Sequence, residues 1–223
     1  MNLDISKLTI DIGTELRLQH AEKIRGYLGR LFWKNPYAHN HLQNGKLIYS
    51  YPRVQYKIVE NMCFLIGFGE GAVILIKAFH NLKSMDLNGR AREIKFRSLE
   101  KYSSSFSISQ EKREYIFFTP WLALNEKNYE KYQKLGSWAK RKVLLEKILI
   151  GNIISMSKGL GYTVPGPIEV NILKLREVNT SLKGNPMLGF LGEFEVNFEI
   201  PDYLGIGKSV SRGFGTVKKI GMD

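Results

Sequence analysis

The sequence has 223 residues, of which 43% are apolar and 24% charged, a balance typical of globular proteins with one large or two small domains. It has no signal-peptide pattern and no run of about 18 apolar residues, so we expect a cytoplasmic protein that does not span a membrane. The single cysteine, Cys63, excludes a disulfide scaffold. With only this thiol and four histidines in the whole sequence, a structural zinc site is not expected. The formal net charge of +12 favours a polyanionic partner. Because we find neither a basic amphipathic anchor helix nor a lipidation signal, we expect nucleic acid rather than a membrane.

The first half of the chain alternates strand and helix patterns. Thr14 is a candidate N-cap for the first helix, which should end before Asn35-Pro36. The apolar face of this helix has three- and four-residue spacing and comprises Leu16, Ala21, Ile24, Leu28, Leu31 and Phe32. The other predicted elements are strands over 7–12, 46–51, 54–59, 63–67 and 91–99 and a helix over 70–82. This order is the split βαβ arrangement of a ferredoxin-like fold.

The second half repeats the order less regularly. A strand is predicted over 106–119, followed by a basic helical region over 126–156 that is interrupted near Gly136-Ser137. Strands follow at 168–178 and 188–200, and the tail is glycine-rich before a last short strand. We therefore predict an α+β protein with two tandem ferredoxin-like domains, at 1–102 and 103–223.

The strongest local motif is a loop with four glycines in the eleven residues 205–215. Glycines let backbone N–H groups approach an anion closely, and Lys208, Ser209 and Arg212 add cationic and hydroxyl donors. The loop therefore suits a phosphodiester backbone, although a turn that only closes the fold would have a similar composition. A nucleotide-binding P-loop is excluded, because it would need a glycine at the position of Asp202.

The segment 67–72 matches the dinucleotide-binding pattern, with a strand before it and a helix after it. Glu70 would place a negative charge beside a bound pyrophosphate, and no parallel βα unit continues the pattern. We interpret the segment as a strand-to-helix turn.

The basic stretch 127–147 includes Lys140 and Arg141 and also contains Tyr129, Tyr132 and Trp138. Aromatic rings among cations can follow single-stranded RNA through stacking and charge. A solvated helix face is the alternative explanation.

Two histidines, His39 and His41, follow the first helix. An unperturbed imidazole has a pKa near 6.5 and can act as a general acid or base at neutral pH. If RNA is the substrate, its 2′-hydroxyl is a built-in nucleophile, so the reaction needs neither metal nor cofactor. Lys46, Arg53 and Lys57 are candidate cations for the developing phosphorane charge. Two surface-loop histidines without a catalytic role are the alternative, and His20 or Tyr37 would then be the next candidate for the base.

Together these motifs resemble the CRISPR precursor-RNA endoribonucleases, the Cas six type of the repeat-associated RAMP superfamily. The resemblance rests on Arg212-Gly213-Phe214-Gly215, Ile24-Arg25-Gly26, His39-Asn40-His41 and the stretch 51–57, and extends over nearly the whole chain. It implies tandem ferredoxin-like domains and metal-independent cleavage of CRISPR repeat RNA to a 2′,3′-cyclic phosphate. A non-catalytic RNA-binding subunit of a CRISPR complex with the same fold is the alternative.

By this resemblance, His41 or His39 is the general base and Lys46 stabilises the transition state. The partner is RNA, other CRISPR-complex subunits are further candidate partners, and we expect a monomer or homodimer. The predicted RNA-binding residues are Lys208, Ser209, Arg212, Gly213, Gly215, Arg53, Lys57, Lys140 and Arg141.

Overall fold

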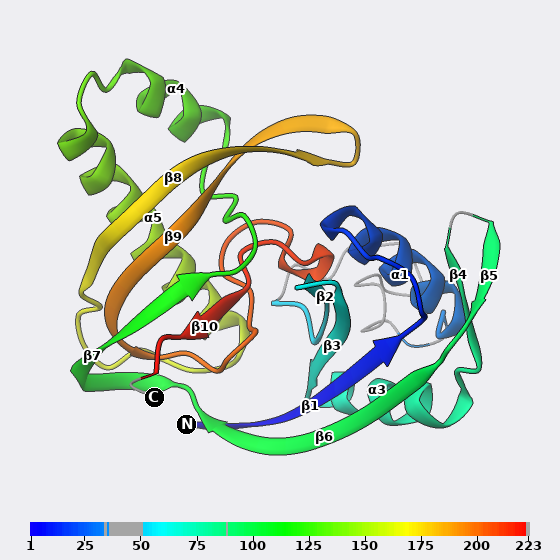
Figure 1. Ribbon diagram of the computed structural model, residues 1–223. Coiled ribbons are helices and arrows are strands. Elements are labelled where there is room, and N and C mark those ends of the chain that lie inside the picture. The colour runs from blue at the N-terminus through cyan, green and yellow to red at the C-terminus, as the bar shows by residue number, and fades with distance from the viewer. Residues whose placement is uncertain (34, 36–50, 88, 222–223) are drawn as a thin grey trace. The chain divides into compact units, whose positions relative to one another are not determined.

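The computed structural model describes residues 1–33, 35, 51–87 and 89–221 (Figure 1). The chain forms two compact units. The N-terminal unit comprises Asn2–Ser105 together with Val210–Gly213. The C-terminal unit comprises Met1, Phe106–Ser209 and the chain from Phe214 onward. The domain junction that we predicted near residue 102 lies inside the last strand of the N-terminal unit.

The N-terminal unit has one four-stranded antiparallel sheet with the strand order β2-β3-β1-β6. Its elements are β1 (Asn2–Asp11), α1 (Leu18–Leu31), β2 (Val54–Val59), β3 (Met62–Phe68), α3 (Glu70–Asn81), β4 (Ser84–Leu87), β5 (Arg90–Glu93) and β6 (Phe96–Ser105). The split βαβ order predicted from the sequence is confirmed, because the last strand pairs with the first. The core lies between this sheet and its helices and includes Leu8, Ile24, Leu28, Leu65 and Leu75.

Two local predictions in this unit were wrong. Helix α1 begins at Leu18 with Arg17 as its N-cap, not at Thr14. The Asp11 carboxylate accepts a hydrogen bond from the Gly13 N–H at 2.7 Å, and this turn delays the helix. The segment 91–99 is two strands, because β5 pairs with β4 whereas β6 pairs with β1.

The C-terminal unit repeats the arrangement with the strand order β10-β7-β9-β8. Its elements are β7 (Ser107–Phe117), α4 (Glu126–Lys134), α5 (Trp138–Gly159), β8 (Val170–Leu182), β9 (Asn185–Glu199) and β10 (Val217–Lys219). The predicted helix break near Gly136-Ser137 is confirmed, since Ser137 is the N-cap of α5. Between β9 and β10 the chain forms the glycine-rich loop, which contains the 3₁₀ turn η1 (Val210–Arg212). Tandem ferredoxin-like domains are therefore the fold of this chain.

Aromatic residues fill the core of the C-terminal unit. Phe190, Phe194 and Phe198 on β9 are all fully buried, as expected for side chains that alternate along a half-buried strand. Phe117 stacks on Trp121 with their ring centroids 5.3 Å apart. This core holds the sheet that carries the candidate interface.

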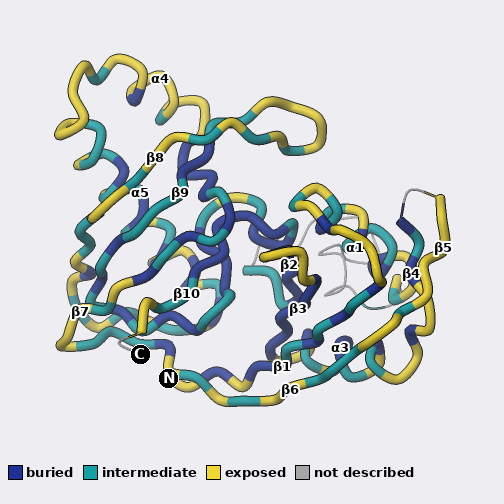
Figure 2. The backbone as a smooth tube through the Cα atoms, in the orientation of Figure 1, coloured by how far each residue is buried: buried dark blue, intermediate teal, exposed yellow. Residues whose placement is uncertain are grey.

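The β8–β9 hairpin is longer than the predicted strands at 168–178 and 188–200. Its ladder continues to the pair Leu182 and Asn185, and Lys183 and Gly184 form the turn with positive φ angles of 52° and 81°. Figure 2 shows that the distal part of this hairpin and most of α4 are exposed. No helix in the described part of the chain is long and apolar enough to cross a membrane.

Candidate nucleic-acid interface

Two glycines of the loop 205–215 shape the chain instead of presenting free donors. The Gly215 N–H donates to the Pro120 carbonyl at 2.9 Å, and the Gly213 N–H donates to the Val210 carbonyl at 3.2 Å. Gly215 has a φ of 62°, and a Cβ there would lie 2.0 Å from the Ile206 carbonyl oxygen. The prediction that Gly213 and Gly215 bind RNA is therefore corrected, because both residues are buried and their N–H groups are already used.

The open part of the loop is Lys208-Ser209. The Lys208 side chain is exposed, while its backbone N–H donates to the Leu122 carbonyl at 3.4 Å. Ser209 is half-buried and has a φ of 61°, a left-handed conformation that is strained for a residue with a Cβ. Such strain is typical of loops that hold a ligand group in place.

At the other end of the loop, η1 contacts α1 and β2 within the N-terminal unit. Arg212 Nε donates to Glu22 Oε1 at 3.1 Å. Burial, followed by the nearby Arg212 charge, lowers the pKa of Arg25 below its ordinary value. Arg212 is therefore a partly buried member of a cationic cluster rather than a freely solvated side chain.

Lys57 departs from its predicted role. Its side chain is fully buried in β2, and Nζ donates to the Val210 carbonyl at 3.3 Å. Burial lowers the pKa of Lys57 to about 7, because desolvation penalises the charged form. An ammonium without solvent access cannot contact an RNA phosphate, so Lys57 is an internal anchor of η1.

Of the two predicted cations on α5, only Lys140 is exposed. Arg141 is half-buried over the Tyr132 ring, and its Nε donates to the Leu135 carbonyl at 3.0 Å. Its Nη1 is 3.3 Å from Glu177 Oε1. Arg141 thus joins α5 to β8, and its role as an RNA contact stays a prediction from the sequence.

Arg53 is half-buried, and its guanidinium lies 5.6 Å from the centroid of the Phe68 ring. The neighbouring 67–72 segment is the strand-to-helix turn that we predicted. A Cβ on Gly71 would lie 2.0 Å from the Arg53 carbonyl oxygen. Protein backbone thus fills the space that a pyrophosphate would need at Gly71.

The three predicted catalytic residues, His39, His41 and Lys46, lie outside the described residues, as does Tyr37. The reserve candidate His20 accepts a hydrogen bond at Nδ1 from the Arg17 N–H at 2.9 Å. Burial, with Lys23 and Arg17 nearby, lowers its pKa. His20 therefore caps α1. Residues 1–33, 35, 51–87 and 89–221 contain no group of three or more His, Cys, Asp or Glu side chains that could hold a metal ion.

The C-terminal unit contains a groove of about 580 Å³ that the sequence patterns did not predict. It lies where α4 faces the distal β8–β9 hairpin, and Lys208 of the glycine-rich loop also lines it. One wall of this groove is the distal β8–β9 hairpin, which was not expected because residues 179–187 were not predicted as strand. The turn pair Lys183-Gly184 was the signal that could have revealed it.

The chain matches known families over almost its entire length. The Cas6b N-terminal domain model matches residues 1–105, and the Cas6b C-terminal domain model matches residues 107–220. A crystal structure of Cas6b is 37% identical, covers 99% of this chain and 100% of its own, and superposes with a TM-score of 0.91. A crystal structure of the CRISPR RNA processing endoribonuclease Cas6b is 35% identical with the same coverage and a TM-score of 0.79.

An uncharacterized protein of Methanocaldococcus jannaschii is 43% identical over 140 residues, which are 63% of this chain and 95% of that protein. The type IV Cas6 crRNA endonuclease Csf5 is only 10% identical and shares the fold, with a TM-score of 0.62. The resemblance inferred from the sequence is confirmed. Since the two domain models together span residues 1–105 and 107–220, this chain belongs to the Cas6b family.

Proposed function

We propose that this chain is an endoribonuclease that processes CRISPR repeat RNA. The observation that carries this proposal is the 35% identity to a CRISPR RNA processing endoribonuclease over 99% of this chain and 100% of that one. The alternative, a binding-only subunit of a CRISPR complex, is not favoured.

The proposed reaction uses the substrate's own 2′-hydroxyl. A general base removes its proton, the 2′-oxygen attacks the adjacent phosphorus, and the 5′-oxygen leaves with a proton. The product strand then ends in a 2′,3′-cyclic phosphate. Because the nucleophile belongs to the substrate, the protein supplies in-line positioning, proton transfer and cations, without a metal ion.

We assign the base to His41 or His39 and the transition-state cation to Lys46. These assignments rest on the sequence. His20 uses Nδ1 to cap α1, and His80 packs edge-on against Phe79 with ring centroids 5.3 Å apart. His20 therefore has a structural role, whereas His80 is exposed at the end of α3.

The exposed cations Lys208 and Lys140, with the partly exposed Arg53 and Ser209, support RNA binding. The net charge of +12 supports the same partner. Association with other CRISPR-complex subunits, the choice between monomer and homodimer, and a cytoplasmic location stay predictions from the sequence.

The test is to incubate the protein with its host's repeat RNA in EDTA, beside a copy with a single 2′-deoxy substitution at the cut site. We expect cleavage of the first RNA, no cleavage of the second, and a cyclic phosphate on the product. Cleavage of the 2′-deoxy RNA would contradict the proposed nucleophile. Binding without cleavage of the repeat would favour the non-catalytic subunit.

The base is tested with His41→Ala and His39→Ala. Loss of a general base should lower the cleavage rate by about 10²–10⁴-fold in one of the two variants. His20→Ala is the matched control and should cleave at the wild-type rate. If both variants cleave as the wild type does, the base lies elsewhere.

A further inference from the structure

The groove in the C-terminal unit has walls from three parts of the chain. They are the first two turns of α4, the distal β8–β9 hairpin, and the glycine-rich loop. The lining includes Asn125, Tyr129, Gln133, Asn179, Met187 and Lys208. Its volume of about 580 Å³ lies within the range of about 300–1,000 Å³ that is usual for small-molecule sites.

An aromatic ring is available on one wall. Tyr129 is 45% exposed, although it belongs to a helix whose next aromatic residue, Tyr132, is fully buried. Met187 and Leu188 provide apolar surface on the hairpin side. An aromatic ring and an apolar wall that line the same groove suit a flat heterocycle, because stacking on the ring contributes binding free energy.

Polar groups line the same space. The side-chain amides of Gln133 and Asn179 supply both donors and acceptors, the groups that read the edge of a base, whereas the Asn125 oxygen already accepts the Asn128 N–H at 2.8 Å as the cap of α4. The carboxylates of Glu126 and Glu177 also line the groove, and Glu177 accepts hydrogen bonds from the Tyr132 hydroxyl at 2.6 Å and from Arg141 at 3.3 Å. A carboxylate on the wall disfavours a phosphate inside the groove but not a neutral base.

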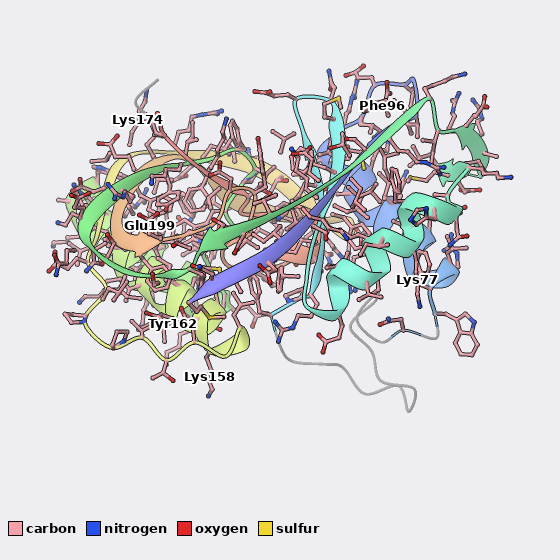
Figure 3. All side chains as sticks on the ribbon, turned by 90° about the horizontal axis from the view of Figure 1, so that it is seen from below. Lys77, Phe96, Lys158, Tyr162, Lys174 and Glu199 are labelled. Carbon is pink, nitrogen blue, oxygen red and sulfur yellow. The ribbon has the colours of Figure 1, made fainter. Side chains whose placement is uncertain are left out.

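The charge that would hold the backbone lies around the groove. Lys208 lines the groove and is exposed, and α4, which forms one wall, carries Lys127, Lys131 and Lys134 against Glu126 and Glu130. Lys174 is also exposed on β8, toward the base of the hairpin (Figure 3). A polyanion attracted to this region can place its phosphate near Lys208 while its base enters the groove.

We propose that this groove binds one unpaired nucleotide of the RNA, with the base stacked on Tyr129 and the phosphate held by Lys208. The proposal rests on the proposed function only in taking RNA as the ligand. A paired base is already stacked within a helix, so the site selects single-stranded segments.

The probe is a fluorescein-labelled oligo(A) decamer with 2′-O-methyl riboses, which cannot be cleaved by 2′-oxygen attack. A second decamer carries abasic residues on the same phosphate backbone. The wild type should bind oligo(A) more tightly than the abasic decamer. Tyr129→Ala should weaken oligo(A) binding by about 5- to 150-fold and leave abasic binding unchanged. Tyr129→Phe keeps the ring and should restore binding to within about twofold.

Phe96→Ala is the matched control, since Phe96 is 55% exposed on β6 and does not line the groove. Equal wild-type affinity for the two decamers, or equal oligo(A) affinity of Tyr129→Ala and the wild type, would overturn the proposal. Because the probes cannot be cleaved, these outcomes are separate from the cleavage test. A protein that binds the base but leaves the repeat intact keeps this site and loses the proposed activity.

Discussion

The buried Nζ of Lys57 donates a hydrogen bond to the carbonyl of Val210, 153 residues further along the chain, at 3.3 Å. Val210 is the first residue of η1, so this bond fastens the glycine-rich loop to β2 within the N-terminal unit. Burial lowers the pKa of Lys57 from its ordinary 10.5 to about 7. The loop's anchor is therefore sensitive to pH in a range that experiments can reach.

The Lys57→Met variant should reveal this dependence in the free energy of unfolding. The unfolded lysine keeps its proton up to about pH 10.5, whereas the folded one loses it near pH 7, so the wild type becomes more stable as pH rises between these values. Relative to Lys57→Met, the wild type should gain up to about 1.4 kcal/mol per pH unit in this window and show little pH dependence below it. Denaturant unfolding at pH 6, 7, 8 and 9 measures the difference.

Lys77→Met is the control for this measurement. Lys77 is exposed on α3, as Figure 3 shows, so its replacement should shift stability equally at every pH. A difference between wild type and Lys57→Met that stays constant from pH 6 to 9 would show that Lys57 does not lose its proton in this range.

The turn between β3 and α3 offers a matched pair of glycine substitutions. In Gly71→Ala the new Cβ would lie 2.0 Å from the Arg53 carbonyl oxygen, so the backbone must move, at a cost of about 3 kcal/mol or more in unfolding free energy. In Gly69→Ala the Cβ meets no atom within 4 Å, and the cost comes from the backbone, whose φ of 55° and ψ of −128° are disfavoured for any residue with a Cβ, at about 1–3 kcal/mol. Thermal and denaturant unfolding of both variants give the comparison. Equal losses would mean that packing against Arg53 does not decide the choice of glycine.

Local patterns in the sequence predicted most elements of the fold. The predicted strand at 54–59 is β2, and the predicted helix at 70–82 exceeds α3 by one residue. Such elements depend on propensity and apolar spacing within a few residues, which the sequence contains. The tandem split βαβ topology then follows from the order of these elements.

Residues buried by distant parts of the chain could not be predicted in this way. All six residues of β2 are buried, including Lys57, because both α1 and η1, which lies about 150 residues further along the chain, pack on this strand. A charged residue in a strand normally indicates a solvated face, so Lys57 was assigned to RNA. Gly213 was missed for the same reason, since its surroundings are Tyr56, Ala21 and Leu18.

His20 should contribute to stability rather than to cleavage. Its Nδ1 accepts the Arg17 N–H bond at the start of α1, so His20→Ala should lose about 1 kcal/mol of unfolding free energy. Burial lowers its pKa below 6.5, so the folded state binds fewer protons and this contribution is lost as pH falls through the lowered pKa. The stability gap between wild type and His20→Ala should therefore shrink between pH 7 and pH 5.

His20→Gln is the companion variant, because a glutamine at the third helical position can cap without titrating. The unfolding free energy of His20→Gln should equal that of the wild type at pH 7. At pH 5 the glutamine cap should still contribute, because it does not titrate. A gap between wild type and His20→Ala that widens toward pH 5 would contradict the assignment of Nδ1 as an acceptor.

Lys208 should act through charge on the RNA backbone. Its side chain is exposed and lines the groove, so Lys208→Ala removes a cation without opening the core and should leave the unfolding temperature nearly unchanged. If Lys208 contacts one phosphate of a single strand, the slope of log K against log salt should become about 0.7 less steep. The measurement is a titration of single-stranded repeat RNA at several salt concentrations, with Lys208→Arg as the variant that keeps the charge. Identical slopes for Lys208→Ala, Lys208→Arg and the wild type would leave the loop with a structural role only, because a cation on a phosphate must release counterions when it binds.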